Sequence, residues 1–513
     1  MSRRSFLILG LLVLLATHSM AQKTPEYVGD ELLVKFRRSA SSEEIKETNK
    51  KNRASTVETL GDLGWQRIKL PPSLTVPAAI TKYQASGLVE QAQPNFYYSL
   101  LATPNDPSFP APGMYGLLKI SAPQAWDLNT GNPAVIVANI DTGIRYTHED
   151  LAANMWVNAG EIAGNGIDDE GNGFFDDVYG YDFRFNDPDP ADQHGHGTHT
   201  AGTIGAVGNN GVGVVGVNWN VKLMAIKIYS PTGNDTTSAM LINAYNYVRM
   251  MKNRGINIRV TNNSYGGCPE TCGFDQATKD AIDALGDADI LNVFAAGNSG
   301  TNNDVTPFYP ASYTSPSIIA AGASNQSDDR IFSFGPNSVD LAAPGSGILS
   351  TLFSSDAAYG HMSGTSMAAP HVSGAAALLA AQNPSLSAAS LKATLMNTVD
   401  QLPQWNGFVR SGGRLNTFNA LQNQTVCNFG LPASSILVPT KGGQITVNVT
   451  AAQNCDYSIK SNVNWILVTG PTVQSGNGQV KFWVRLNTTM RRTGTLTIGG
   501  QTLTIVQSRD GIL

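Results

Sequence analysis

The chain of 513 residues is longer than one ordinary domain, since domains commonly hold about 150 residues, and this length predicts three or four units. Its composition is 42% hydrophobic but only 14% charged, with 51 glycines and 26 prolines, which indicates a turn-rich globular protein. The net charge of -5 argues against a nucleic-acid or anionic-membrane partner, because both usually require a basic excess. Four cysteines are too few for a disulfide scaffold but can form two bridges.

The first residues have the order of a secretory signal: Arg3 and Arg4, an apolar run over residues 6–16, and Ala21 at the expected cleavage point. A membrane anchor is the alternative, but the run is shorter than the roughly 20 residues that a spanning helix needs. Residues 2–7 also resemble a twin-arginine signal, so the export route stays open. We expect a removable signal peptide over residues 1–21 and a secreted or periplasmic, extracellular protein, where disulfides persist.

The next stretch, residues 22–102, predicts a small α+β unit. Strand-like runs at residues 31–36, 65–70 and 88–93 alternate with helix-like runs at residues 41–52 and 76–85.

A larger α/β domain is predicted over residues 103–422. Continuous apolar runs at residues 135–140, 223–228, 258–263, 290–295 and 317–321 are separated by helical segments. Such runs are typical of a parallel sheet with helices on both faces. Residues 423–513 change to a texture rich in Thr, Val and Gly, with alternating stretches at 444–450 and 494–506, which predicts an all-β domain.

Three motifs in the α/β domain contain candidate catalytic residues. Asp141 follows an apolar strand, a histidine cluster spans residues 194–199, and Ser366 begins a predicted helix at residues 364–371. Functional groups gather at the carboxyl ends of parallel strands. Taken singly, the motifs are also explained by a turn, a zinc site and a helix cap.

Together and in this order, the motifs resemble those of the subtilisin-like serine proteases, in particular the thermitase-like branch. The resemblance implies a subtilisin-like, mostly parallel sheet and a serine endopeptidase that acts through an acyl-enzyme on a broad range of proteins. It assigns Asp141, His196 and Ser366 to a catalytic triad, because a serine needs a base within reach and that base needs an orienting partner. His194 and His199 are expected to be helix-entry or packing residues.

Residues 295–300 match the family motif that carries the oxyanion donor, which implies that the Asn298 amide and the Ser366 backbone N–H stabilise the tetrahedral intermediate. An extended peptide is expected to pair with residues 263–267 as an added strand. Phe308 is expected near the floor of the first pocket, where it favours small side chains, or else it points into the core. The implied substrate-binding residues are Ser264, Tyr265, Gly266, Ala295, Ala296 and Gly297.

An acidic loop at residues 165–177 has oxygen ligands at alternate positions and a glycine turn, as at the start of an EF-hand loop. This density of hard oxygen ligands suits structural Ca²⁺, although Tyr179 stands where an EF-hand has its bidentate Glu. A solvated acidic loop is the alternative. The candidate ligands are Asp168, Glu170, Asn172, Asp176 and Asp177.

The thermitase-like resemblance implies two further calcium sites. The first is expected to tie the start of the α/β domain to its body, and the second precedes His196. The ligands of the first are Asp106, Asp150, the Asn210 side chain and the backbone oxygens of Val207, Val212 and Val214. Those of the second are Asp182, Asp187 and Asp189.

Both flanking units also resemble known modules. Residues 22–102 resemble the family's ferredoxin-like propeptide, an intramolecular inhibitor and chaperone that the enzyme is expected to cut off between Tyr98 and Thr103. Residues 423–513 resemble a BACON-type, immunoglobulin-like β-sandwich, which implies possible attachment to carbohydrate or mucin; Trp465 is either a binding platform or a core residue.

Two of the four cysteines lie in the expected β-domain and two lie close together in the expected α/β domain. We expect bridges from Cys427 to Cys455 and from Cys268 to Cys272, since no nearby His-Cys spacing supports zinc. Two rival functions remain, an inactive binding or adhesion protein and a processing protease with one preferred sequence. A monomer is expected.

Overall fold

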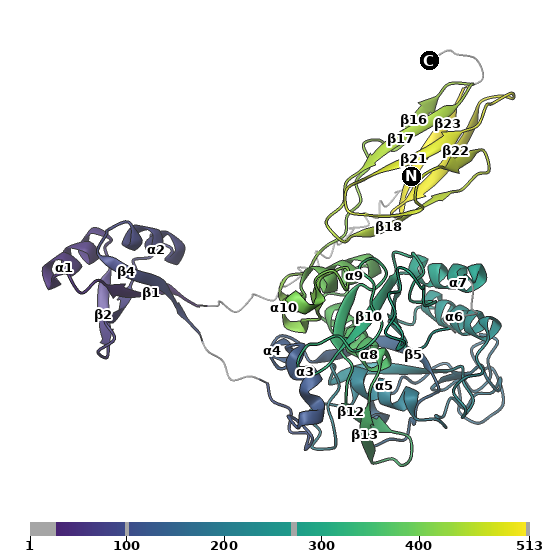
Figure 1. Ribbon diagram of the computed structural model, residues 1–513, viewed down its shortest axis with the longest axis horizontal. Helices are drawn as coiled ribbons and strands as arrows, with labels where there is room; N and C mark the ends of the chain where they lie inside the picture. Colours follow the sequence, from purple (N-terminus) through teal and green to yellow (C-terminus); the bar gives the residue numbers. More distant parts are fainter. Residues whose placement is uncertain (1–26, 98–101, 268–273, 509–513) are drawn as a thin grey trace, which may run out of the picture. The chain divides into compact units, whose positions relative to one another are not determined.

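The computed structural model describes residues 27–97, 102–267 and 274–508. The predicted signal peptide and the Cys268–Cys272 pair therefore lie outside the described residues, as does most of the expected propeptide cleavage region. The chain divides into two compact units between residues 100 and 101 (Figure 1). None of the helices described is long and apolar enough to cross a lipid bilayer.

The N-terminal unit is a four-stranded antiparallel sheet with two helices. Its elements follow the order β-α-β-β-α-β of ferredoxin-like folds. A capping box between Ser41 and Glu44 starts the first helix, and the core includes Leu32, Ile68 and Tyr83. The sheet order is β2-β3-β1-β4, and the elements are β1 (Tyr27–Phe36), α1 (Ser42–Lys51), β2 (Ser55–Leu60), β3 (Trp65–Lys69), α2 (Val76–Gln84) and β4 (Val89–Phe96).

A nine-stranded sheet forms the centre of the second unit. Its order is β14-β15-β11-β10-β9-β8-β5-β7-β6, and its strands are parallel except for the β14–β15 pair. The long strands are almost fully buried, which is why their sequences are continuously apolar. The strands are β5 (Gly131–Asp141), β6 (Gly180–Asp182), β7 (Asn220–Lys227), β8 (Ile258–Asn263), β9 (Leu291–Ala295), β10 (Ile318–Ser324), β11 (Leu341–Pro344), β14 (Asp400–Gln401) and β15 (Gly413–Arg414).

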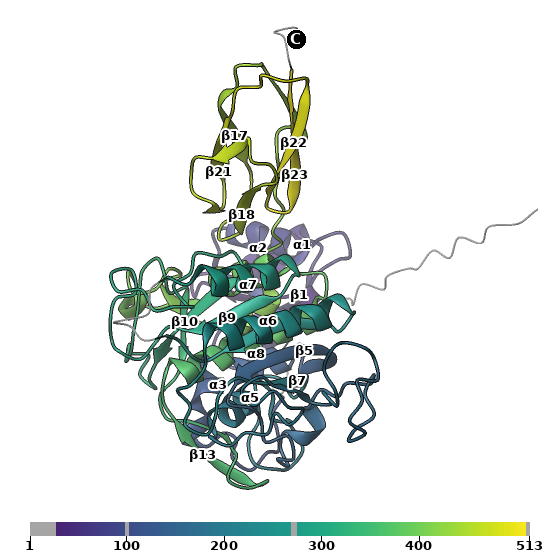
Figure 2. The same ribbon diagram turned by 90° about the vertical axis from the view of Figure 1, so that its right-hand side faces the viewer.

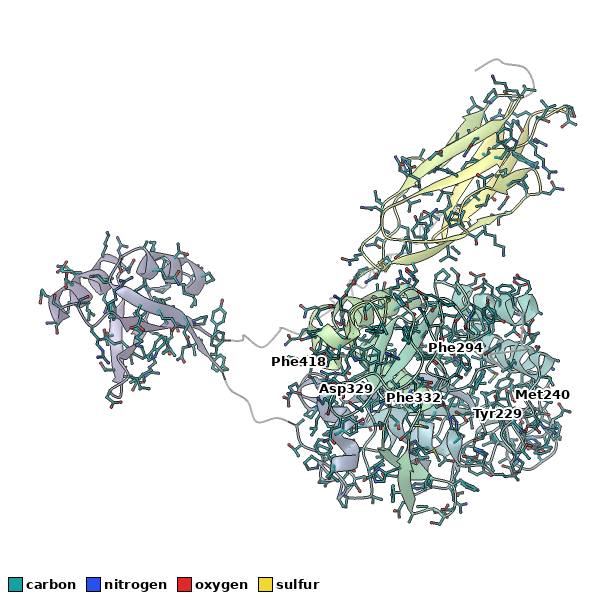
Figure 3. The ribbon with its side chains drawn as sticks, viewed as in Figure 1. Tyr229, Met240, Phe294, Asp329, Phe332 and Phe418 are labelled. Carbon is teal, nitrogen blue, oxygen red and sulfur yellow. A yellow bond between two sulfur atoms is a disulfide. The ribbon has the colours of Figure 1, made fainter. Side chains whose placement is uncertain are left out.

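Helices cover both faces of this sheet, as predicted. The α6 and α7 helices lie over one face, where Phe294 of β9 is fully buried (Figures 2 and 3). The α5, α8 and α9 helices pack on the other face. The helices of the unit are α3 (Tyr115–Lys119), α4 (Ala122–Trp126), α5 (His196–Gly205), α6 (Ser238–Asn253), α7 (Gln276–Asp287), α8 (Thr365–Gln382), α9 (Ala388–Asn397) and α10 (Thr417–Gln422), and a hairpin of β12 (Ile348–Leu352) and β13 (Ala358–Met362) precedes α8.

The C-terminal domain is a β-sandwich of a five-stranded and a three-stranded sheet around one core. The expected Cys427–Cys455 disulfide is present. Asp456 is paired with Lys392 and Arg410 of the α/β domain at 2.9 and 2.8 Å. The strands are β16 (Ser435–Val438), β17 (Gly443–Val449), β18 (Asp456–Ser461), β19 (Ile466–Val468), β20 (Val473–Ser475), β21 (Gly478–Val484), β22 (Arg492–Ile498) and β23 (Gln501–Gln507).

Candidate active site

A carboxylate and an imidazole meet where β5 ends and α5 begins. Asp141 is the last residue of β5, His196 is the first of α5, and Asp141 Oδ1 lies 2.7 Å from His196 Nδ1. The Asp141 carboxylate is buried, and it also accepts hydrogen bonds from the Thr142 N–H at 2.8 Å and the Thr200 hydroxyl at 3.2 Å. A carboxylate at Nδ1 fixes the imidazole proton there, so Nε2 is left as the basic nitrogen.

Two negative charges act on His196. Burial alone would lower its pKa, but the charge and hydrogen bond of Asp141, together with the charge of Asp192, raise the pKa above the ordinary value. Asp192 is itself buried and accepts hydrogen bonds from the backbone N–H groups of His194, Gly195 and Thr198. Asp192 therefore holds the start of α5 in place and also supplies a negative charge near the imidazole.

Ser366 is the second residue of α8 and is tied to the segment after β8. Its hydroxyl donates to the Ser264 carbonyl at 3.0 Å, and the Ser264 hydroxyl donates to the Ser366 carbonyl at 2.9 Å. Pro370 lies four residues after Ser366 and has no N–H, so the Ser366 carbonyl lacks its helical donor. The Ser264 hydroxyl fills that place and joins the two segments.

Asn298 presents its amide nitrogen beside Ser366. Its Oδ1 accepts hydrogen bonds from the Thr365 N–H and the Thr365 hydroxyl, both at 2.9 Å. Because a backbone N–H can only donate, the side-chain oxygen must face Thr365, and the exposed Nδ2 is left to donate elsewhere. The Ser366 N–H lies in the first turn of α8, where backbone donors have no helical acceptor.

These groups line one cavity of about 270 Å³. It contains Asp141, His196, Ser366 and Asn298, together with five of the six residues expected to bind substrate. Ala296 is the exception, because it is fully buried against Val339, Ala342 and Trp405. The five are Ser264, Tyr265, Gly266, Ala295 and Gly297.

Three further side chains line the cavity wall, and one of them, Tyr229, has no signal in the sequence. His194 lies two residues before α5, at the helix entry as expected, and it also lines the cavity, with its ring centroid 6.4 Å from that of His196. Tyr229, which follows β7 and is labelled in Figure 3, carries no motif. Phe308 lines the cavity, which is the first of the two positions expected for it, and its ring also packs against the core. Their positions depend on loops that are distant in sequence.

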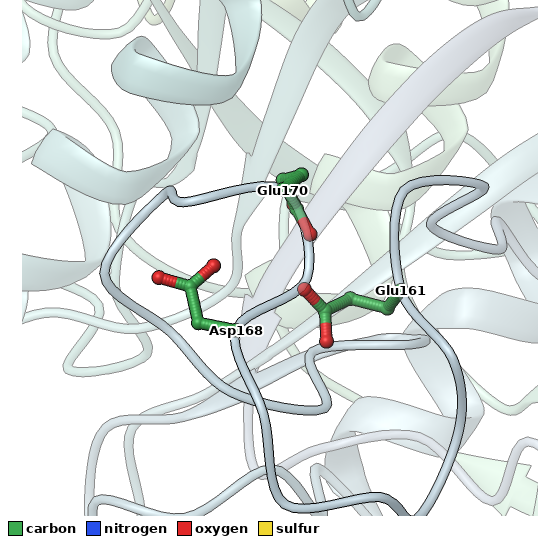
Figure 4. A group of neighbouring side chains, drawn as sticks. All are labelled: Glu161, Asp168 and Glu170. Atoms are coloured by element: carbon green, nitrogen blue, oxygen red, sulfur yellow. The ribbon is translucent and has the colours of Figure 1, made fainter.

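The acidic loop brings three carboxylates together. Ligand oxygens of Glu161, Asp168 and Glu170 lie within 4.8 Å of one another (Figure 4), and no other such group of acidic, His or Cys residues occurs among the described residues. Glu170 Oε2 is buried without a hydrogen-bond partner. Burial and the adjacent Glu170 carboxyl raise the pKa of Glu161 to about 7. The crowding fits a cation, and Glu161 was missed because it precedes the EF-like pattern.

All the carboxylates of this loop have protein donors; Asp168, for example, accepts from the backbone N–H groups of Asn172 and Gly173. Asp176 accepts backbone hydrogen bonds from Gly164, Asn165 and Gly166. Asp177 accepts from the side chains of Asn158, Asn172 and Tyr247. Burial raises the pKa of Asp177 to about 6. These residues shape the loop around the three carboxylates.

The first predicted thermitase-like site is assembled from distant segments. Asp106 accepts from the Asn209 N–H at 2.7 Å, and Asp150 accepts from the Asn210 amide and the Val214 N–H, both at 2.8 Å. Val207 and Val212 also belong to this network, through the Asp150 carbonyl and Asn210 Oδ1. Burial raises the pKa of Asp150 to about 6 and that of Asp106 above its usual range. The two buried carboxylates are contacted here by N–H donors, so the expected calcium ligation, including the backbone oxygens of Val207, Val212 and Val214, stays a prediction.

The second predicted site is less closely assembled. Asp182 is buried in an ion pair with Lys227 at 2.8 Å. Asp189 accepts from the Tyr146 hydroxyl at 3.0 Å, and Asp187 accepts from the Asp189 N–H at 3.0 Å. The three carboxylates are not brought within 4.8 Å of one another as a group. This site stays a prediction.

Comparison with known families decides the classification. A family model described as the subtilase family matches residues 132–424, which is more than half of the chain and includes all three motifs. The chain belongs to the subtilase family. A second model, described as the fervidolysin N-terminal prodomain, matches residues 16–95. The subtilase is therefore a serine endopeptidase with an N-terminal propeptide region.

Individual relatives agree with this classification. The subtilase is 36% identical to thermitase of Thermoactinomyces vulgaris over 321 residues, which cover 62% of this chain and 99% of thermitase. It is 32% identical over 397 residues to a thermophilic serine proteinase of Bacillus sp. (strain AK1), covering 77% of this chain and 88% of that protein.

Proposed function

We propose that the subtilase cleaves peptide bonds through an acyl-enzyme on Ser366, with His196 as general base and Asp141 as its orienting partner. The Asp141–His196 pair at 2.7 Å, in one cavity with Ser366, is the observation that carries the proposal. The Ser366 hydroxyl leaves the Ser264 carbonyl and donates to His196 Nε2. It then attacks the substrate carbonyl while the imidazole takes its proton.

The developing oxyanion is stabilised by Asn298 Nδ2 and the Ser366 N–H. Thr365 holds the amide in place before substrate arrives, so little reorganisation is needed. His196 then gives its proton to the leaving amine, which departs. A water molecule, deprotonated by the same imidazole, releases the acyl group and restores Ser366.

Protein substrates are proposed to bind as an extended strand along residues 264–266, with their main chain as the recognised feature. Such binding tolerates many sequences and favours a broad endopeptidase over a processing protease with one preferred site. The propeptide region is proposed to act as an intramolecular inhibitor that the enzyme cuts off itself.

Structural Ca²⁺ is proposed at two places. Glu161, Asp168 and Glu170 would hold one ion, and Asp106, Asp150 and Asn210 would hold another with backbone oxygens nearby. The bound ions would neutralise crowded carboxylates and stabilise the loops that support the sheet. Secretion is proposed from the N-terminal signal pattern.

Carbohydrate binding by the C-terminal domain would depend on exposed aromatic residues. Trp465 packs against the sandwich core with Arg492 at 4.2 Å over its ring, whereas Trp483 is 46% exposed. The binding role implied by the BACON resemblance would therefore belong to Trp483 and not to Trp465.

A serine-directed fluorophosphonate tests the proposed nucleophile. The purified enzyme should hydrolyse casein, lose this activity on treatment, and carry one phosphonyl adduct on Ser366 by peptide mass spectrometry. Ser366→Ala should have neither activity nor adduct, whereas Ser363→Ala, an exposed serine three residues earlier, should keep both. An adduct on another residue, or full casein hydrolysis by Ser366→Ala, would contradict the proposal and favour a binding or adhesion protein.

A further inference from the structure

Two backbone segments beside Ser366 form a narrow slot. Residues 264–266 lie on one side and residues 295–297 on the other, and both line the cavity that holds Ser366. Gly266 and Gly297 leave room in the slot because they have no side chain. We expect the substrate to pair with residues 264–266 and to present the carbonyl of its scissile bond to Asn298. The side chain of the residue that carries this carbonyl then enters the slot.

The ring of Phe308 lies in contact with both walls of the slot. A Cβ added to Gly266 would lie 2.0 Å from Phe308 Cε1, and one added to Gly297 would lie 3.0 Å from Phe308 Cγ. The ring therefore fills the space that each glycine leaves open. The enzyme's own side chain occupies the position where a large substrate side chain would otherwise fit.

The backbone around Phe308 is fixed on both sides. The Phe308 N–H donates to the Ser312 hydroxyl at 2.9 Å, and the Ser312 N–H donates back to the Phe308 carbonyl at 2.9 Å. The Gly267 N–H donates to the Tyr309 carbonyl at 2.7 Å, which joins this loop to the substrate-pairing segment. Tyr309 stacks on Tyr313 with ring centroids 4.6 Å apart. These contacts oppose withdrawal of the whole loop from the slot.

We propose that Phe308 restricts the subtilase to cleavage after small residues, alanine and serine above all, and excludes aromatic and long aliphatic residues at that position. The inference rests on the proposed role of Ser366. Basic residues are disfavoured as well, because among the described residues Asp141 is the one carboxylate in the cavity lining, and it is engaged by His196. Phe308 is thus a specificity-determining residue, and broad activity on proteins reflects the abundance of small residues.

The test is a set of peptides that differ only in the residue before the scissile bond: Ala, Ser, Leu, Phe or Lys. We expect wild-type kcat/KM for Ala to exceed that for Phe by at least about 10-fold, since even one methylene group in a pocket changes selectivity about 10- to 200-fold. Phe308→Gly and Phe308→Ala should raise kcat/KM for Phe and Leu and reverse the order.

Phe274→Ala is the matched control. Phe274 packs edge-on against Tyr309 and Tyr313 of the same loop, at 5.6 and 5.3 Å, but does not line the cavity. It should keep the wild-type order. Wild-type preference for Phe over Ala overturns the inference even if the Phe308 variants fail to fold, and so does an equal change of order in Phe274→Ala. If the wild type takes up no fluorophosphonate on Ser366 and cleaves none of the peptides, the proposed function has failed instead.

Discussion

The imidazole of His196 lies near two carboxylates with different tasks. Asp141 binds Nδ1 directly, whereas Asp192 acts through its charge and through the backbone of the α5 N-terminus. In the proposed mechanism both stabilise the imidazolium that forms during catalysis, and both raise the pKa of His196. A raised pKa keeps His196 protonated, and so inactive as a base, to a higher pH.

Removing the Asp192 charge should move the acid limb of the pH profile. In Asp192→Asn the imidazolium loses a favourable charge, so the pKa of His196 falls and the acid limb of kcat/KM shifts to lower pH. Asp329→Asn, an exposed carboxylate outside the cavity lining and labelled in Figure 3, is the control and should leave the limb unchanged. If the acid limb of Asp192→Asn stays at the same pH or moves to higher pH, Asp192 acts only through its backbone contacts.

At the residue scale, the sequence predicts the groups that sit in continuous motifs. Asp141, His196, Asn298 and Ser366 each lie near the end of a strand or in the first turn of a helix, and the structure places all four in one cavity. The residues that were missed act across long separations in the chain. Tyr229, for instance, lines the cavity with Gly266 only after the fold brings two loops together, and no local pattern encodes that position.

Element prediction was most successful where apolar residues run continuously. The ends of β5, β7, β9 and β10 lie within four residues of the predicted ranges, and β8 coincides with its range, because burial on both faces demands such runs. β2 (Ser55–Leu60) was missed, since most of its residues are exposed and its sequence does not alternate. The two-residue strands β14 and β15 are too short to carry any pattern.

The acidic loop should bind Ca²⁺ through Glu170. Calorimetric titration of chelator-treated enzyme should show one bound ion fewer in Glu170→Gln than in the wild type, and Ca²⁺ should raise its Tm by less, because a ligand stabilises the folded state by mass action. Asp280→Asn, which removes an exposed carboxylate of α7, should match the wild type. Equal ion counts in Glu170→Gln and the wild type would exclude this site.

For the whole molecule, the structure has two compact units, whereas the sequence predicts three folded regions, and that finer division stays a prediction. The C-terminal sandwich belongs to the same unit as the α/β domain, and Asp456 contributes to this through buried contacts with Lys392 and Arg410. Although burial alone would raise the pKa of Asp456, these cations hold it well below its usual range. The sequence predicted the nearby disulfide but not the ion cluster, because residues 392, 410 and 456 share no motif.

The proposed role of Ser366 is to give this chain its peptidase activity, including removal of its own propeptide. Mass spectrometry of the protein secreted from a protease-deficient host tests it most directly. The wild type and Ser363→Ala should begin between Tyr98 and Thr103, and Ser366→Ala should keep its propeptide. Identical trimming of Ser366→Ala and the wild type would contradict the claim.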